Sequence, residues 1–466
     1  MRPFDVFTRW RPLPRTESQT PTPEIDRVHT KHPNALVSTS LAPPHTTKVI
    51  HSHCRPWKSN PVFTHVFEAH DTNKTVFDKV VSPILPRVLN GETCNLLAYG
   101  HSGSGKSHTI IGYDFETEDE FGLCLAAARD LTAEVARLNE TVDKGSEDEL
   151  GIGLRMYELR GNSAFDLLNS HCRCHIREGY DGQTHIRGET EVMTDGRVRV
   201  RPIATKACWT FDDLRRELLA GRELRATRTS TVHDQSSRTH AVLEIELVTR
   251  ALLDARNAVI ERQSELVPVA KRATDVYLEE NMKAFVRTED GKYVPNPAYQ
   301  IDQARIHEAE ARQAELEAYV QDAETHVDEL MQSSSHPCLG GKLVFVDLAG
   351  SEYYHEKPIS GSAPRAKQTP QEQREGRQIN TDLLALKEVI RARALKQSRI
   401  PYRSSPLTMV LRAHFEPSGP TNSYTAMILT ASPEVTQYAA TMNTLKYGNL
   451  VGVAGEDKAG TAARRA

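Results

Sequence analysis

The chain has 466 residues, a formal net charge of −4 and an isoelectric point near 6.6. This length permits a large buried core, and the near-neutral balance argues against binding nucleic acid through bulk charge, while leaving room for a local basic face. The N-terminus has no apolar leader, and no run approaches the roughly 18 apolar residues of a membrane span, so we expect neither a secretion signal nor a span.

Cysteine usage predicts a reducing compartment. The seven cysteines form neither an even disulfide ladder nor a CxxC pair, and we expect a cytoplasmic protein. Residues 171–175, His-Cys-Arg-Cys-His, are similar in composition to a zinc site. Adjacent and alternate positions rarely converge on one tetrahedral ion, so we interpret this run as the edge of a strand.

Apolar runs alternate with helix-compatible segments along the chain. We predict strands at about residues 4–8, 94–99, 152–159, 241–249, 343–347 and 424–431. This alternation is typical of an α/β fold with a mostly parallel central sheet flanked by helices on both faces. Residues 14–46, rich in Pro, Thr, Ser and His, are expected to form an irregular surface loop.

The first motif with readable chemistry is a glycine-rich loop directly after the apolar run 94–99. It comprises Gly100, His101, Ser102, Gly103, Ser104, Gly105, Lys106 and Ser107. Glycines let backbone N–H groups point at phosphate oxygens, the lysine reaches the β- and γ-phosphates, and the serine hydroxyl holds Mg²⁺ at the start of a helix. We predict a nucleotide-binding P-loop; the alternative is a Gly/Ser-rich surface loop.

A second motif, Ser236, Ser237 and Arg238, precedes the strand expected at 241–249. Two adjacent hydroxyls and an arginine suit a loop that closes over Mg²⁺ and the γ-phosphate of a nucleotide.

Residues 251–337 have a helical composition rich in Ala, Glu, Arg and Gln. Within them, apolar residues follow a three-four spacing, with a second helix-compatible stretch at 252–282. The spaced residues are Ile306, Ala309, Leu316, Val320, Ala323, Val327 and Leu330. We predict a helical hairpin that projects and pairs with itself; a partner-binding or dimerising arm and a disordered or wrongly assigned segment are the alternatives.

A third motif occupies residues 341–352. Leu343 to Val346 form a continuous apolar run, as expected for a strand buried on both faces. Asp347 follows, where a carboxylate can hold Mg²⁺ through water, and Gly350 offers an unobstructed backbone N–H to a γ-phosphate. The alternative is an ordinary strand that ends in a turn.

In that order, the P-loop, the Ser-Ser-Arg loop and the Asp347–Glu352 loop resemble the kinesin motor domain. The resemblance extends to residues 9–12, 157–159, 375–380, 400–403 and 443–447, and leaves out 251–337 and parts of 13–50. It implies a P-loop NTPase fold of kinesin-motor type over residues 1–450, with 251–337 as a helical insertion and 451–466 as a short tail.

The resemblance also implies roles for individual residues. Arg9, Arg11, Pro12 and His108 would flank the adenine of ATP, and residues 100–107 would hold the phosphates. Mg²⁺ would be held by Ser107 and Ser237, with Asp347 holding its water shell. Ser236 and Gly350 would position the attacking water and the γ-phosphate, while Arg238 and Glu352 would form the ion pair that closes the two loops. Phosphoryl transfer then needs positioning and charge more than covalent help.

A basic stretch is the predicted contact with acidic microtubules. Between residues 385 and 404 the single acid Glu388 stands against Lys387, Arg391, Arg393, Lys396, Arg399 and Arg403. On a slightly acidic chain this is a concentrated patch. The alternative is a solvated helix face with loose ion pairs.

Several positions depart from the kinesin pattern. His233 stands where kinesins usually carry Asn, which favours altered hydrolysis or nucleotide release. Thr381 and Asp382 replace the usual Lys-Ser, and Ser404 to Pro406 lose one basic contact. No neck linker or stalk is recognisable after Tyr447, so we expect either a fragment or a protein without two-headed architecture.

Two functions follow from the resemblance. The first is an ATP-hydrolysing microtubule motor or microtubule-end regulator on the cytoskeleton. The second is a nucleotide-binding, hydrolysis-poor microtubule scaffold, with a further partner on the 251–337 insertion. An unrelated P-loop NTPase would require three ordered motifs to coincide.

Overall fold

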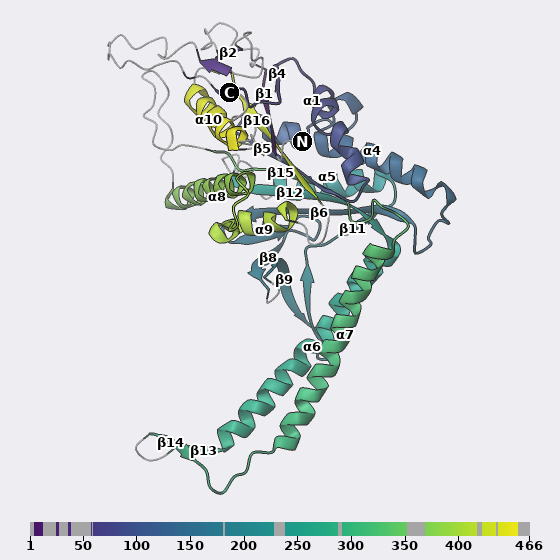
Figure 1. The fold of residues 1–466 in the computed structure, drawn as a ribbon, viewed down its shortest axis with the longest axis vertical. Coiled ribbons are helices and arrows are strands. Elements are labelled where there is room, and N and C mark those ends of the chain that lie inside the picture. The colour runs from purple at the N-terminus through teal and green to yellow at the C-terminus, as the bar shows by residue number, and fades with distance from the viewer. Residues whose placement is uncertain are drawn as a thin grey trace, which may run out of the picture.

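The computed structural model describes residues 4–12, 25–27, 36–38, 57, 59–179, 182–227, 238–287, 291–351, 369–416, 422–434 and 437–454. Across these residues the chain folds around a 12-stranded sheet, with helices on both faces and two long helices that project from one end (Figure 1). The predicted α/β fold, with helices on both faces and a helical insertion, is confirmed. None of the described helices is long and apolar enough to cross a membrane.

One side of the sheet, from β15 to the edge strand β4, is parallel. Its strands run in the order β15-β5-β16-β1-β4, and each pair of neighbours is parallel. Their bounds are β1 (Phe4–Trp10), β4 (His65–Phe67), β5 (Thr93–Tyr99), β15 (Lys342–Asp347) and β16 (Ser423–Ala431). Every residue of β5 is buried, because helices cover both sides of this strand. The carboxyl ends of these strands therefore share one edge, where the P-loop and Asp347 lie.

Antiparallel strands extend the sheet beyond β15. β12 (His240–Thr249) pairs with both β15 and β6 (Leu150–Arg160). A ribbon of shorter strands follows: β7 (Ser163–Asp166), β8 (Cys172–Glu178), β9 (Thr184–Val192), β10 (Val198–Pro202) and β11 (Lys206–Cys208). The apolar pattern of the sequence did not predict the ribbon β8 to β10. These strands are largely exposed and rich in Arg and Glu, so they lack an apolar run. Cys172 and Cys174 fall on β8, which confirms the strand interpretation of residues 171–175.

Two hydrophobic clusters, one on each face of the sheet, hold the helices in place. On one face lie α1 (Asn73–Val80), α2 (Leu85–Val88), α4 (Leu123–Leu138) and α5 (Phe211–Thr227). On the other lie α8 (Pro370–Ala394), α9 (Pro406–Phe415) and α10 (Tyr438–Ala454). Leu96 joins the first cluster and Leu97 the second, since successive side chains of a strand point to opposite faces. Short β2 (Ile25–Arg27) and β3 (Leu36–Ser38) form a separate pair.

The projecting arm is a hairpin of two helices, as predicted. α6 (Arg250–Lys283) and α7 (Gln303–Ser333) pack against each other, and β13 (Phe285–Arg287) and β14 (Tyr293–Pro295) form a small ribbon at the tip (Figure 1). Of the spaced apolar residues, Ile306, Leu316 and Val320 are buried. At the distal end, hydrogen bonds from Tyr299 and Arg305 lower the pKa of the Glu280 carboxyl to about 2.

The root of the arm belongs to the main core. The Thr249 hydroxyl accepts a hydrogen bond from the Leu252 N–H at 3.2 Å and so caps α6. Leu252 is fully buried in the first hydrophobic cluster, where Val327 of α7 also packs. Arg197, directly before β10, and Arg199 of β10 both pair with Glu261. The boundaries 251–337 of a separable insertion stay a prediction, and the distal part of the arm is the portion without such contacts.

We expect residues 267–320 to be removable without loss of the fold. Gln263 of α6 donates a hydrogen bond to Glu324 of α7 at 3.4 Å, so the two helices are close enough there for a short Gly/Ser linker to join them. This variant should keep its affinity for fluorescent ADP within about twofold, because loop closure costs little. Removal of 251–337 also deletes the core side chain of Leu252, and a lost core leucine costs about 2–5 kcal/mol.

Thermal unfolding and ADP titration of the two variants test this expectation. An aggregating 267–320 variant, or one with ADP affinity lowered by an order of magnitude, would show that the distal arm supports the core.

Candidate nucleotide site

The P-loop is held in a conformation that depends on its glycines. It joins β5 to α3 (Lys106–Ile110). Gly103 and Gly105 adopt φ values of 74° and 104°, in the left-handed region that favours glycine. A Cβ on Gly100 would lie 2.5 Å from the Thr430 carbonyl oxygen of β16, so only glycine fits there. The backbone can therefore wrap around a phosphate while packed directly against the sheet.

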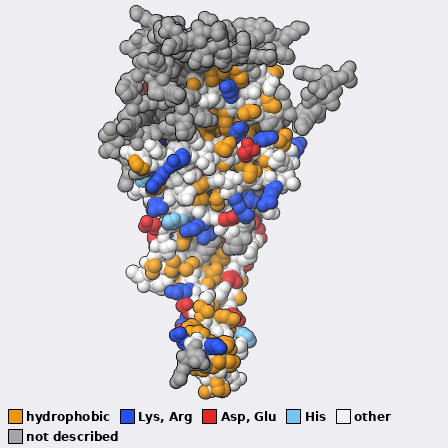
Figure 2. Space-filling view, turned by 90° about the vertical axis from the view of Figure 1, so that its left-hand side faces the viewer, with side chains coloured by type: hydrophobic (Ala, Val, Ile, Leu, Met, Phe, Trp, Pro, Cys, Tyr) orange, Lys and Arg blue, Asp and Glu red, His pale blue; other side chains and the backbone are white. Residues whose placement is uncertain are grey.

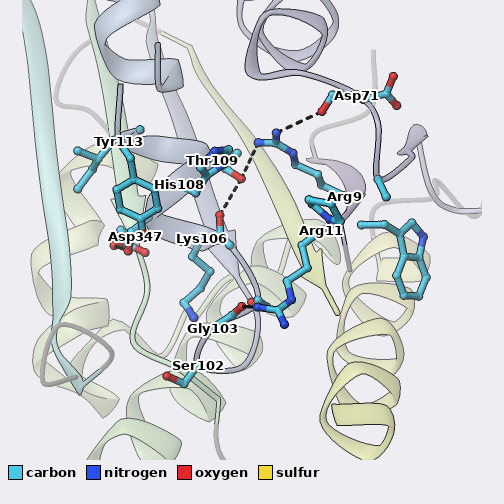
Figure 3. Close-up of a pocket in the computed structure, with 18 of the residues that line it drawn as sticks. Arg9, Arg11, Asp71, Ser102, Gly103, Lys106, His108, Thr109, Tyr113 and Asp347 are labelled. Carbon is cyan, nitrogen blue, oxygen red and sulfur yellow. Dashed lines mark hydrogen bonds between the residues drawn. The ribbon is translucent and has the colours of Figure 1, made fainter. Parts of the chain in front are cut away.

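The Lys106 side chain lies within the loop. Its ammonium donates hydrogen bonds to the carbonyl oxygens of Gly100, at 3.0 Å, and His101, at 2.8 Å. The residue is only 6% exposed, and Figure 3 shows its side chain running toward Gly103 and Ser102. A buried cation on the inner side of a phosphate loop is the arrangement that a nucleotide β- or γ-phosphate requires.

A cavity of about 550 Å³ opens beside this loop. It is large enough for a small-molecule ligand, since such pockets span roughly 300–1,000 Å³. Four predicted adenine-side residues line it, Arg9, Arg11, Pro12 and His108. The P-loop, Asp347 and two arginines of α5, Arg222 and Arg225, line the rest. Contact of the first four with adenine stays a prediction.

Arg9 and Arg11 brace the cavity wall. The Arg9 guanidinium donates to the Asn73 side chain at 2.6 Å and to the Thr109 hydroxyl at 2.9 Å, and burial lowers its pKa to about 10. Arg11 donates to the Gly103 carbonyl oxygen at 2.8 Å, which ties β1 to the P-loop (Figure 3). Arg9 therefore remains charged at neutral pH, and both arginines already have partners in the protein.

Two histidines at this site are uncharged near neutral pH. Burial lowers the pKa of His101 to about 4, and its Nδ1 lies 2.7 Å from the Ser102 carbonyl oxygen. Burial also lowers the pKa of His108, whose ring centroid lies 5.5 Å from that of Tyr113. The two ring planes are tilted by 55°, so His108 and Tyr113 give the cavity an uncharged aromatic corner rather than one flat wall.

Two of the predicted metal ligands, Ser107 and Asp347, meet where β15 ends. The Asp347 Oδ2 accepts a hydrogen bond from the Ser107 hydroxyl at 2.6 Å. The Asp347 Oδ1 is buried without a hydrogen-bond partner among the described residues. A carboxylate and a hydroxyl that meet beside a phosphate loop are hard oxygen donors, which fits Mg²⁺. Ser237, the third predicted ligand, lies outside the described residues.

Arg225 of α5 is a site residue that the sequence did not predict. Its guanidinium donates to the Asp347 Oδ2 at 2.9 Å and lies 3.8 Å from Glu158 of β6. Glu158 in turn accepts a hydrogen bond from the Thr239 hydroxyl at 2.9 Å. One arginine among many on a polar helix carries no signal of its own. Its role emerges only because the fold brings α5 against the end of β15.

The loop after β15 lies directly on the P-loop. A Cβ on Gly350 would lie 2.9 Å from the Ser102 backbone nitrogen, and the Ser351 N–H donates to the Gly100 carbonyl oxygen at 3.1 Å. The Gly350 backbone therefore stands beside the phosphate loop, and its contact with a γ-phosphate stays a prediction.

The remaining predicted site residues are only partly placed. His233, Ser236, Ser237 and Glu352 lie outside the described residues. Arg238 is described, and its guanidinium lies 3.8 Å from the Glu375 carboxylate of α8, which accepts a 2.7 Å hydrogen bond from Arg160. The Arg238–Glu352 ion pair stays a prediction.

Comparison with known proteins identifies the family. The model of the kinesin motor domain matches residues 9–270 and 317–452, which is most of the chain. The chain therefore belongs to the kinesin motor domain family. The residues between the two matched ranges, 271–316, form the distal part of the arm.

Individual relatives agree with this assignment. The chain is 26% identical over 389 residues to kinesin-like protein KIF24 of Homo sapiens, covering 84% of this chain and 20% of the relative. It is 26% identical to kinesin-like protein KIN-13A of Oryza sativa subsp. japonica, covering 96% and 40%. The chain thus spans less than half the length of these two relatives.

A solved structure supports the fold. The structure of a fast kinesin superposes with a TM-score of 0.55 at 20% identity, covering 96% of this chain and 91% of the other.

We expect Asp347→Asn to weaken Mg²⁺-dependent nucleotide binding. Loss of the carboxylate should raise the Mg²⁺ concentration for half-maximal ADP binding by about tenfold, the effect of one charged ligand contact. Fluorescent-ADP titration at a series of Mg²⁺ concentrations measures the shift. Asp71→Asn is the matched control, because Asp71 lies on the side of the cavity opposite Asp347 and its carboxylate points away from Asp347 (Figure 3). Equal shifts in both variants would refute a metal position at Asp347.

Proposed function

We propose that this protein is an Mg²⁺-dependent ATPase whose turnover is stimulated by microtubules. The observation that carries the proposal is the convergence of four groups at one sheet edge: the Lys106 ammonium, the Ser107 hydroxyl, the Asp347 carboxylate and the Gly350 backbone. Membership of the kinesin motor domain family supports ATP as the nucleotide and microtubules as the track.

The proposed chemistry is positioning by the protein. The P-loop N–H groups and Lys106 hold the β- and γ-phosphates, and the Gly350 N–H binds a γ-phosphate oxygen. Ser236 orients the attacking water, while Arg238 and Glu352 hold the two loops closed over it. Bound Mg²⁺ neutralises phosphate charge. Such preorganised charge accounts for most of the acceleration in phosphoryl transfer.

A hydrolysis-poor microtubule scaffold is the second candidate function. It is favoured by His233, at the position where kinesins usually carry Asn in the loop that would hold the attacking water. A protein of this kind would bind ATP and ADP through the same P-loop while turning over slowly. Turnover, rather than nucleotide affinity, distinguishes the two candidates.

The proposed track-binding face lies over α8 and the loop that follows it. Figure 2 shows the side of the molecule that carries α8 and α9. Lys and Arg side chains gather across the middle of this surface. Arg391, Lys396 and Arg399 are exposed and Lys387 is half-buried. An exposed cationic face of this kind complements an acidic track, with a cytoskeletal location as the consequence.

Two arginines of the predicted patch have other contacts. The Arg393 guanidinium donates to the Phe415 carbonyl oxygen at 2.8 Å and stacks on the Phe415 ring at 4.7 Å. Burial lowers its pKa, and we assign it a structural role instead of a track contact. Arg403 pairs with Glu178 of β8 yet stays exposed. A further partner on the arm stays a prediction.

Wild-type protein is expected to hydrolyse ATP, with microtubules raising the rate by at least about tenfold. Lys106→Ala should weaken nucleotide binding and abolish turnover, because the buried cation at the phosphates is lost. Phosphate release with and without microtubules measures both effects. Lys74→Ala, which removes an exposed lysine of α1, is the control and should match wild type. A wild-type rate no higher than that of Lys106→Ala would leave the scaffold as the better description.

Microtubule affinity should depend on salt and on the exposed cations of the α8 region. Simultaneous replacement of Lys387, Arg391 and Arg399 by Ala should weaken co-sedimentation by about tenfold at low salt and leave basal ATPase nearly intact. Screening over about 8 Å at physiological ionic strength weakens exposed contacts first.

Lys74, Arg137 and Lys144, replaced together by Ala, form the matched control. These three replacements remove the same amount of positive charge, but from the side of the molecule that carries α1 and α4 (Figure 1). Equal weakening by both triple variants would mean that net charge, and not this face, governs binding.

A further inference from the structure

His240, the first residue of β12, is attached to the loop that follows Asp347. The residue is only 2% exposed. Its Nδ1 accepts a hydrogen bond of 3.0 Å from the Ala349 N–H, one residue before Gly350. A ring nitrogen that accepts carries no proton, so the neutral imidazole has its proton on Nε2. This hydrogen bond therefore links the position of the His240 ring to the position of the Gly350 loop, which would bind the γ-phosphate.

The opposite side of the ring faces a buried carboxylate that it does not quite reach. His240 Nε2 is buried and has no hydrogen-bond partner among the described residues. It lies 3.7 Å from the Asp382 Oδ2 of α8. Asp382 is 3% exposed, and its other oxygen accepts a 3.0 Å hydrogen bond from the Gln378 side chain. A buried donor left without an acceptor costs free energy, and a shift of about 1 Å would restore a normal bond.

There is space for such a shift. A cavity of about 250 Å³ separates α8 from the ends of β6 and β12. One face of α8 lines it, through Glu375, Gln378, Ile379 and Asp382, and His240 and Arg238 line the opposite wall. Close-packed side chains leave little room to move, so this cavity gives α8 space to approach β12.

We propose that Asp382 is a positioning residue that couples the Gly350 loop to α8 through His240. In the open arrangement described here, the Nε2 and carboxylate are apart. When Gly350 takes up a γ-phosphate, Ala349 and His240 move with it, α8 shifts toward β12, and the Nε2–H donates to Asp382. Asp382 stands where kinesins usually carry Ser, so the carboxylate at this position is a feature of this chain.

The consequence for α8 rests on the proposed function. The helix continues from Asp382 to Lys387 and Arg391, so a shift that closes the His240–Asp382 gap also moves the basic face. Asp382 would thereby tie the state of the nucleotide to the position of the proposed track-binding cations.

Equilibrium nucleotide affinity tests the coupling without turnover. Fluorescent ADP and a non-hydrolysable ATP analogue are titrated against wild type, Asp382→Ala, Asp382→Asn, His240→Gln and the His240→Gln/Asp382→Ala double variant. We expect Asp382→Ala to lower affinity for the analogue by about tenfold, the weight of one hydrogen bond to a charged group, while ADP affinity changes less than about twofold. Asp382→Asn keeps a side-chain oxygen and should recover most of the loss. The double variant should match His240→Gln alone, since both changes break one bond.

Two outcomes would overturn the coupling: equal loss of affinity for ADP and the analogue, or additive losses in the double variant. Wild-type protein that binds both nucleotides but does not hydrolyse ATP would refute the proposed ATPase while these affinities still decide the role of Asp382.

The imidazole resonances of His240 give a second measurement that does not require a stable variant at position 382. In protein labelled with ¹⁵N-histidine, signals lost in His240→Gln identify this ring. We expect a ring protonated at Nε2, whose Nε2–H resonance moves downfield when the ATP analogue replaces ADP, as a hydrogen bond forms. A resonance that stays unchanged between the two nucleotides contradicts the proposed closure.

Discussion

The parallel pairing of β5 with β15 is the constraint on which the site depends. Its register sets Leu97 opposite Val346 and Ala98 opposite Asp347. The two strands therefore end together, and the Ser107 hydroxyl comes within 2.6 Å of the Asp347 carboxylate. A slip of one residue would turn every side chain of β15 to the other face of the sheet and remove this contact. The burial of both strands on both faces makes such a slip costly.

Charge at the site is concentrated in a buried cluster behind the phosphate loop. Arg225 compensates Asp347 directly and lies near Glu158, which Thr239 also contacts. In a region of low dielectric, these groups are stabilised only as a set, because each alone would be a buried unpaired charge. The antiparallel placement of β12 between β6 and β15 brings the start of β12, with Thr239 and His240, to the same edge as Asp347. From this edge the contacts continue to Glu375 and Asp382 on α8.

The same antiparallel pairing explains where the arm emerges. β12 starts at the nucleotide edge and ends at Thr249, opposite the beginning of β15. The connection between these two strands therefore lies at the far edge of the sheet, away from the P-loop. Both ends of the insertion meet there, and a long self-paired hairpin adds little to the cost of closing the connection. Its first turn still joins the core through Leu252, whereas its distal part is stabilised by contacts of its own, such as those of Glu280.

Features that depend on a local pattern could be predicted from the residues alone. The six apolar runs became β1, β5, β6, β12, β15 and β16, because continuous burial leaves a continuous apolar pattern. The P-loop, Asp347 and Gly350 were found because their chemistry requires those residue types at short spacings. The three-four spacing around Leu316 and Val320 likewise predicted α7. In each case the relevant residues lie within a few positions of one another.

Contacts between distant segments could not be predicted in this way, because they depend on how the elements pack. Arg225 meets Asp347 across 122 positions, and Ala349 meets His240 across 109. The inward direction of Arg393, the contact of Arg9 with Asn73 and the exposed ribbon β8 to β10 also leave no periodic trace. A charged side chain has the same identity in a sequence whether it faces solvent, an ion or a carbonyl oxygen. Its role is fixed by the packing of strands and helices that the pattern specifies only one element at a time.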